Sequence, residues 1–253
     1  MKKITFLLLF FVLCMSACTT SLVVLSSGVL RDASRQYIMR NGLREIIYLP
    51  LHHMGTREYY DKIRNDVDSL QKEGYVVYYE SIAYNLDSDS LREEYDKKFR
   101  KLTGDRLGQQ QCIEIYRDTV PVLRAPMYQK LGNRIIPQPN YSFFTVDYTK
   151  AVNADLPKNK LLDDFEYKYG EVKLNACDLK TKMAEPYRCK PIKSKLKRIF
   201  DKEFIMEARE HNLASLIDDA PMQKILILFG GSHFKGFSSY LQQRDPKWVI
   251  VKK

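Results

Sequence analysis

The chain has 253 residues, and 41 Lys and Arg residues against 31 Asp and Glu residues give it a formal net charge of +10. This length suits one large domain or two small ones. A membrane-spanning helix needs about 20 apolar residues in a row, and the sequence contains no such run, which excludes a membrane-spanning body.

The N-terminus has the pattern of a bacterial lipoprotein leader. A basic start at residues 1–3 precedes the apolar run ITFLLLFFVL at residues 4–13, which fits a secretory signal. Met15-Ser16-Ala17-Cys18 resembles a lipoprotein cleavage box, in which small residues precede the cysteine that receives the lipid. We expect residues 1–17 to be a signal peptide and Cys18 to anchor the protein to a membrane of the cell envelope, facing the periplasm or the cell surface. The alternative is an ordinary signal peptide cut at the same point, with the cysteine incidental.

The positive charge that remains can be explained by ordinary solvent-exposed lysines and arginines, or by a surface that binds anions. Loss of the leader removes two lysines and lowers the formal charge from +10 to +8. The densest basic run, KPIKSKLKR at residues 190–198, suits a solvated loop and helix start. The alternative is a surface that attracts anionic lipid or envelope sugars. Export removes the protein from nucleic acid, so we expect no nucleic-acid partner.

Three cysteines remain beyond the leader and Cys18, and an oxidising envelope permits disulfides between them. Cys177 and Cys189 are close in sequence and flank a loop-like segment, so they are the preferred pair. Cys112 is then the odd thiol. The alternative is that all three are reduced and packed.

Residues 45–80 predict a strand, a helix and a second strand. Residues 45–49 form a short apolar and β-branched run, and apolar side chains then recur at spacings of three and four over residues 57–73. Residues 75–79 repeat the strand pattern. Two short strands joined by one helix are normally parallel. We expect a tether at residues 18–41 and a single domain at residues 42–253.

The C-terminal part repeats this order. Residues 202–217 have the composition and period of a helix, and KILILF at residues 224–229 is the kind of continuous apolar run that lies buried inside a sheet. A short helix at residues 237–243 and a strand at residues 248–251 follow. The sequence therefore predicts an α/β fold with a mixed, largely parallel central sheet flanked by helices.

Polar, titratable side chains stand at the ends of three predicted strands: His52 and His53, then Glu80, then His233. Ligands of open α/β sheets bind at the carboxyl ends of the strands, where these residues would converge. Neighbouring residues of an extended chain point to opposite sides, so we expect only His53 of the doublet in the site and His52 packed behind it. For each position the alternative is an ordinary loop residue or ion pair.

Two histidines and a carboxylate with one open position form a plausible set for a catalytic divalent metal, whose identity the sequence does not give. Without a metal, a histidine would act as a general base on water, with Glu80 orienting or polarising it. Gly230 and Gly231, just before His233, would allow the backbone to approach a ligand closely.

At these residues the chain resembles the TraB/GumN/Tiki superfamily, whose fold is related to erythromycin esterases and to the haem-binding ChaN lipoproteins. The family's late Gly-x-x-His motif matches Gly230–His233, and its glutamate matches Glu80. Its early motif matches Pro50–His53, with Pro50 in place of glycine. The family's polar pair on the helix before the late strand matches Arg209 and Asn212.

The resemblance implies an α/β domain but not one activity, because the superfamily and its relatives include metal-dependent proteases, esterases and haem-binding proteins. Our leading expectation is a hydrolase, either a metal-dependent protease or an esterase, acting on an unidentified small molecule or peptide. His53, Glu80 and His233 would bind the metal or activate water, and Arg209 and Asn212 would stabilise an oxyanion or orient the carboxylate. Two alternatives belong to other functional classes. One is a lipoprotein that binds haem or a similar ligand without turnover, and the other is a degenerate member with an interaction role.

Overall fold

The computed structural model describes residues 35–104 and 135–252. The expected leader, most of the expected tether, Cys18 and Cys112 lie outside the described residues. Within the described part, no helix is long and apolar enough to cross a membrane.

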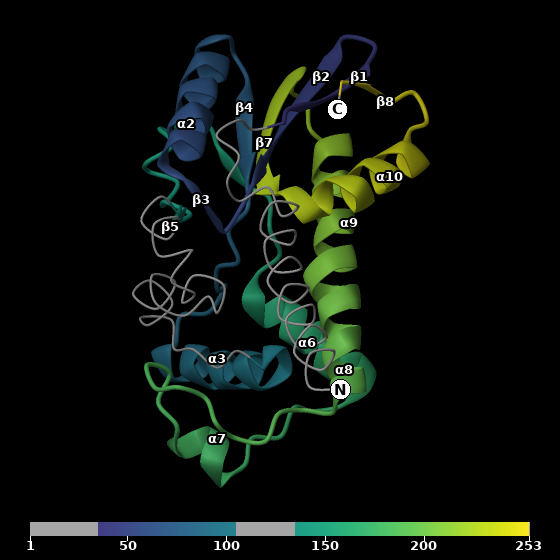
Figure 1. The fold of residues 1–253 in the computed structure, drawn as a ribbon. Helices are drawn as coiled ribbons and strands as arrows, with labels where there is room; N and C mark the ends of the chain where they lie inside the picture. Colours follow the sequence, from purple (N-terminus) through teal and green to yellow (C-terminus); the bar gives the residue numbers. More distant parts are fainter. Residues whose placement is uncertain (1–34, 105–134, 253) are drawn as a thin grey trace, which may run out of the picture.

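A six-stranded sheet with the order β6-β4-β7-β2-β1-β8 forms the centre of the molecule (Figure 1). Three of its pairings, β6 with β4, β4 with β7 and β7 with β2, are parallel. The other two, β2 with β1 and β1 with β8, are antiparallel. The strands are β1 (Tyr37–Asn41), β2 (Arg44–Leu51), β4 (Val76–Tyr79), β6 (Val152–Asn153), β7 (Lys224–Gly230) and β8 (Val249–Lys252).

The sheet is mixed rather than largely parallel, which corrects the expectation. The cause is β1, which forms a hairpin with β2 through a two-residue turn at Gly42 and Leu43. Gly42 has a φ of +58°, a conformation that glycine adopts without steric cost. The hairpin also places Tyr37–Asn41 inside the sheet. Residues 37–41 of the tether expected at residues 18–41 therefore belong to the sheet, and residues 18–34 of that expectation lie outside the described residues.

The predicted strand–helix–strand unit is confirmed. β2 and β4 are joined by α2 (Arg57–Lys72), and both strands run parallel to β7, which lies between them. Thr56 caps α2, because its hydroxyl oxygen accepts a hydrogen bond of 3.1 Å from the backbone N–H of Tyr59. The carboxyl ends of β2, β4 and β7 consequently share one edge of the sheet.

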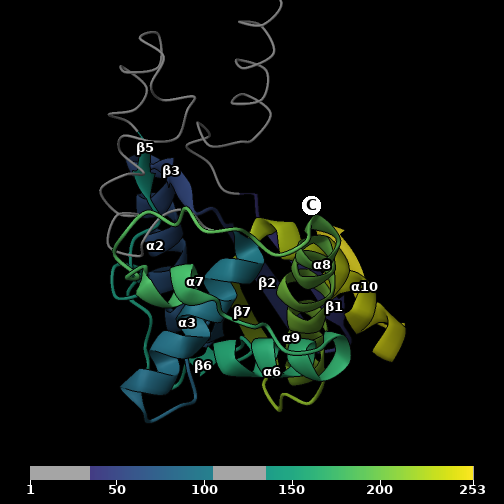
Figure 2. The same cartoon turned by 90° about the horizontal axis from the view of Figure 1, so that it is seen from below.

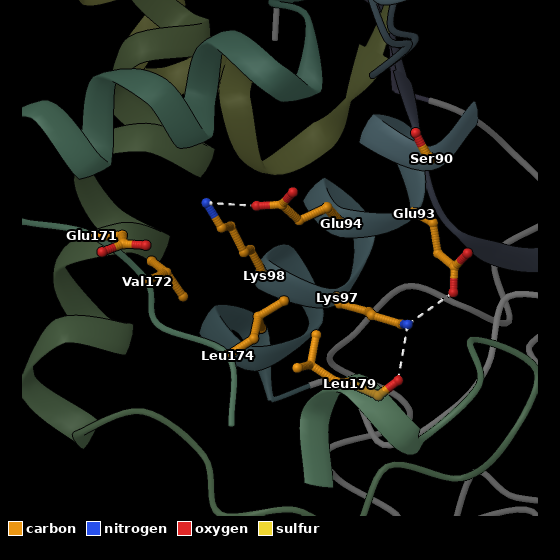
Figure 3. Close-up of a pocket in the computed structure, with 9 residues that line it drawn as sticks. All are labelled: Ser90, Glu93, Glu94, Lys97, Lys98, Glu171, Val172, Leu174 and Leu179. Atoms are coloured by element: carbon orange, nitrogen blue, oxygen red, sulfur yellow. Dashed lines mark hydrogen bonds and ion pairs between the residues drawn. The ribbon is translucent and has the colours of Figure 1, made fainter. Parts of the chain in front are cut away.

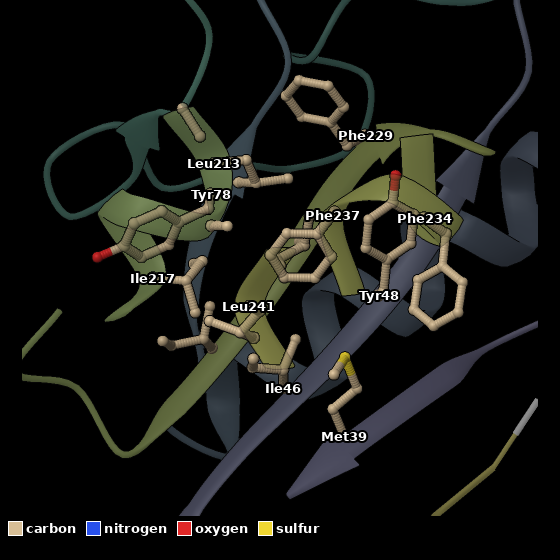
Figure 4. Packing of buried hydrophobic residues seen from close by; sticks show 14 of the residues in the cluster. Met39, Ile46, Tyr48, Tyr78, Leu213, Ile217, Phe229, Phe234, Phe237 and Leu241 are labelled. Atoms are coloured by element: carbon tan, nitrogen blue, oxygen red, sulfur yellow. The ribbon is translucent and has the colours of Figure 1, made fainter. Parts of the chain in front are cut away.

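Ile225 to Phe229 of β7 are all apolar and buried, because both faces of the sheet are covered (Figure 1). On one face, Leu226 and Leu228 pack in the same apolar cluster as the buried stripe of α2. On the other, Ile225, Ile227 and Phe229 pack with α9 (Arg209–Asp218) and α10 (Phe234–Arg244). Figure 4 shows this second cluster, in which Leu213, Ile217, Phe237 and Leu241 reach the sheet from the two helices.

A layer of helices lies beyond the carboxyl ends of β4 and β7 (Figures 1 and 2). Its own apolar cluster is built around Leu161, Phe165 and Phe200. α8 continues into a π-helical segment, η1 (Phe200–Ala208), and then into α9, so one helical rod joins this layer to the sheet. The layer comprises α3 (Asp89–Thr103), α6 (Lys158–Tyr169), α7 (Ala176–Lys180) and α8 (Ser194–Ile199).

Two local features complete the described structure. β3 (Met54–Thr56) pairs with β5 (Ile135–Pro137) in a separate two-stranded sheet. A disulfide joins Cys177 to Cys189, the pair that their spacing favoured, and closes the segment that carries α7.

Candidate functional site

Five ionisable side chains meet at the carboxyl edge of the sheet. Glu80 directly follows β4, Asp155 follows β6 by two residues, and His233 follows β7 after a single helical turn. Arg209 and Glu210 open α9, the helix that covers this end of the sheet. The cluster therefore collects charges from four segments that are distant in sequence, and two of its members, Glu80 and Arg209, are 129 residues apart.

Arg209 lies at the centre of the cluster, and the structure gives an acceptor to each of its five N–H groups. Nε and Nη2 bind the two carboxylate oxygens of Asp155, at 2.7 and 2.8 Å. The second N–H of Nη2 binds Glu80 Oε1 at 2.5 Å. Nη1 binds the carbonyl of Ile205 at 3.2 Å and Nε2 of His233 at 3.3 Å. Arg209 therefore holds two carboxylates and an imidazole in fixed positions.

This geometry differs from the oxyanion role expected for Arg209 and Asn212. With all five donors engaged, Arg209 has no N–H left for a substrate oxygen in this arrangement. Asn212, three residues further along the same helix, donates from Nδ2 to the carbonyl of Ala154 at 2.9 Å. Both residues hold the segment that carries Asp155, so both position the site.

Glu80 is the member of the cluster that meets solvent. Its side chain is 15% exposed, whereas those of Asp155, Arg209, His233 and Glu210 are at most 7% exposed. Its second oxygen, Oε2, accepts a hydrogen bond from the backbone N–H of Gly230. A Cβ at position 230 would lie 3.1 Å from that oxygen, so the glycine permits the close approach of β7 to the carboxylate.

The histidine doublet is arranged differently from the expectation. β2 runs on to Leu51, two residues beyond the predicted strand end, and the chain bends at His53, whose side chain is exposed. The ring of His52 is half-buried against Tyr59, and its Cε1 lies 3.7 Å from where a Cβ of Gly231 would be. His52, rather than His53, therefore lies beside the turn that leads to His233.

The expected metal ligands do not fit a divalent ion in this arrangement. Among the described residues there is no group of three or more His, Cys, Asp or Glu side chains placed to hold a metal. The physical reason is Arg209, whose guanidinium bridges Glu80 and His233 and uses the lone pair of Nε2 that a metal would need. A dication would have to displace a buried cation.

Burial and the neighbouring charges alter the acidities of the groups around the cluster. Burial alone would lower the pKa of Arg209, but Asp155 and Glu80 reverse this and raise it. Burial, with a further contribution from the charge of Glu80, raises the pKa of Tyr48 and of Tyr141. Tyr48 stays protonated and donates its hydroxyl hydrogen to the carbonyl of Gly230 at 2.7 Å, which holds the turn before His233.

The described part of the helical layer contains a pocket, but its chemistry differs (Figure 3). It lies between α3 and the segment around Glu171 and Leu179. Lys97 pairs with Glu93 at 2.8 Å and Lys98 pairs with Glu94 at 3.2 Å. Its lysines are therefore neutralised by neighbours on the same helix, and none of the five cluster residues lines it.

Sequence reasoning missed Asp155 and Glu210. Asp155 follows a strand as Glu80 does, but that strand has only two residues, too few to be recognised in the sequence. Glu210 had no signal beyond its position next to Arg209. No family model, no curated protein and no solved structure matches the chain.

Proposed function

We propose that the chain is an envelope-anchored hydrolase related to the TraB/GumN/Tiki superfamily, in which Glu80 accepts a proton from the attacking water. The observation that carries this proposal is the exposure of Glu80. Of five clustered ionisable groups, the one at the end of β4 reaches solvent, and it does so at the sheet edge where α/β proteins bind ligands. As part of the same proposal, we expect the fold to be related to those of erythromycin esterases and ChaN lipoproteins.

The surroundings of Glu80 suit a positioned base. Arg209 and the N–H of Gly230 each take one lone pair of the carboxylate, which fixes its plane and leaves a further lone pair on each oxygen. A water bound there would lose its proton to Glu80 as it attacks an ester or amide carbonyl. A positioned general base contributes about 10²–10⁴-fold to such a reaction. The proposal uses no metal, because the residues present do not fit a divalent ion. It gives the role of base to Glu80 in place of a histidine, because Nε2 of His233 is engaged with Arg209.

The attachment of the protein to the cell envelope is part of the proposal and can be tested separately. Cys18 would carry the lipid, and the substrate would be a small molecule or peptide of the envelope. Labelled fatty acid should be incorporated into the wild-type chain in cells and should not be incorporated into a Cys18→Ala variant.

Turnover by the full-length chain in detergent tests the catalytic claim. The purified protein is assayed against chromogenic esters, lactones and peptides, alongside Glu80→Gln and a matched control, Glu171→Gln, which changes an exposed glutamate. We expect Glu80→Gln to hydrolyse the substrate at least about 100-fold more slowly than wild type, which is within the range for loss of a general base. The control should retain the wild-type rate.

Three results would contradict parts of this proposal. Equal rates for wild type and Glu80→Gln on every hydrolysed substrate would remove Glu80 from the chemistry. No turnover, together with a Soret band on titration with haem, would favour the ligand-binding alternative. A metal that co-purifies with wild type and is lost from Glu80→Gln would reverse the metal-free assignment.

A further inference from the structure

Glu210 is a buried carboxylate that the proposed reaction does not use. Its side chain is 7% exposed, and it lies against the first turn of α10. Gly236 makes this possible, because a Cβ at that position would lie 1.8 Å from Glu210 Oε2 and 2.3 Å from Cδ. The absence of a side chain at residue 236 is therefore a condition for the position of this carboxylate.

The contact between Arg209 and His233 shows which ring nitrogen carries the proton in this arrangement. A guanidinium carries only donors, so Nε2 of His233, at 3.3 Å from Nη1, must be the acceptor. The proton of the neutral ring is then on Nδ1.

Glu210 lies on the other side of the ring. Its Oε1 is 3.3 Å from Nδ1 of His233, a side chain that is 5% exposed. Within the described residues Nδ1 has no hydrogen bond of good geometry, so Glu210 is the acceptor within its reach. A small movement of either side chain completes a chain of contacts from Glu210 through His233 and Arg209 to Glu80.

We propose that Glu210 is a positioning residue that keeps the proton of His233 on Nδ1, so that Nε2 stays an acceptor for Arg209, and that Gly236 supplies the space for it. Through this chain Glu210 orients the carboxylate of Glu80 without touching substrate. The effect on turnover rests on the proposed hydrolase function, whereas the assignment of the proton does not.

The tautomer is measurable by ¹⁵N NMR of the full-length chain labelled at histidine, at a pH where the ring is neutral. The chain has four histidines, and a His233→Gln spectrum assigns the signals of His233. We expect a protonated Nδ1 and an unprotonated Nε2 in wild type. Glu210→Gln should keep this state, because the amide oxygen still accepts. Glu210→Met removes the acceptor and should give a mixture of tautomers.

Gly236→Ala provides a second route if Glu210→Met does not fold. The added methyl group displaces the carboxylate without changing its chemistry and should shift the tautomer in the same direction. Ser239→Ala, an exposed position on the same helix, is the matched control and should leave the spectrum unchanged. Turnover should fall at least tenfold in Glu210→Met and Gly236→Ala, and not in Glu207→Gln, a similar change three residues away.

A proton on Nε2 in wild type, or a wild-type spectrum in both Glu210→Met and Gly236→Ala, would overturn the inference. Either result is independent of whether any substrate is hydrolysed. Conversely, loss of the proposed function, with the tautomer behaving as expected, would leave the assignment of Glu210 intact.

Discussion

Arg209 is a single residue that holds three other ionisable side chains of the cluster in place. Its guanidinium is buried and bound to Asp155, Glu80 and His233, and two carboxylates share its one positive charge. Removing charges from water costs several kcal/mol per ion, which only good geometry and full hydrogen bonding repay. A fully paired guanidinium meets that condition. For the same reason, the cluster should tolerate the loss of one partner poorly.

Arg209→Met should lower the free energy of unfolding by about 3–5 kcal/mol, because it leaves two carboxylates without their cation. Urea denaturation of the full-length chain measures this. Arg198→Met is the matched control on the same helical rod, where the arginine is exposed, and it should cost less than about 1 kcal/mol. Equal small losses in both variants would show that the cluster contributes little to stability.

At the scale of elements, one pair of positions is tightly coupled where α9 packs on α10. Glu210 on α9 occupies the space that a side chain at Gly236 on α10 would fill. Next to this contact, Phe234 and Phe237 pack against the sheet and fix how α10 lies (Figure 4). Because these rings are buried, α10 cannot move away freely, and a methyl group at residue 236 must displace the carboxylate instead.

A double-mutant cycle tests this coupling. Gly236→Ala should destabilise the wild-type chain. In a Glu210→Ala background it should be neutral or stabilising, because alanine favours a helix over glycine by about 1 kcal/mol. We expect a coupling of about 1–3 kcal/mol from denaturation curves of the four proteins, as for residues in direct contact. Additive effects of the two substitutions would mean that the carboxylate is not where the structure places it.

At the scale of the whole molecule, the sheet and the helical layer have separate apolar clusters that the rod of α8, η1 and α9 connects. The layer has the smaller cluster and is reinforced by other means. Asp178 accepts hydrogen bonds from Lys101 and from the hydroxyl of Tyr187, the latter at 2.7 Å, which ties the α7 segment to α3. The disulfide from Cys177 to Cys189 closes the same segment.

Replacing both cysteines with serine should lower the free energy of unfolding by about 2–3 kcal/mol, the amount expected for closing a loop of this size. A reducing agent should lower the denaturation midpoint of wild type by a comparable amount and leave the double variant unchanged. A reductant effect that persists in the double variant would point to another disulfide.

The sequence was most informative where a periodic pattern is long. The helix of residues 57–72 and the apolar strand at residues 224–230 follow directly from spacing and composition. Glu80 and His233 stood out because they end such strands, and the structure brings them into one cluster with Arg209. β6 has only two residues, which is too few to predict a strand, so Asp155 could not be placed at a strand end from the sequence.

The rest of the site depends on contacts that local sequence does not contain. The polar sequence AREHN at residues 208–212 suggests a solvent-exposed stretch of helix, yet Arg209 and Glu210 are buried. Their burial is permitted by partners 54 and 129 residues away, Asp155 and Glu80, and by a glycine on another helix. The antiparallel β1 was hidden for a similar reason, since its partners β2 and β8 lie on both sides of it only in the folded chain.

The direction of β1 has a consequence for how the protein would sit on a membrane. Because β1 is antiparallel to β2, Tyr37 lies opposite Tyr48, toward the carboxyl edge, and its ring stacks at 3.8 Å on Phe234, the residue after His233. The polypeptide therefore enters the sheet on the side where Glu80 meets solvent. Under the proposed lipid anchor at Cys18, the edge of the sheet that carries Glu80 would also be the edge at which the anchored chain arrives.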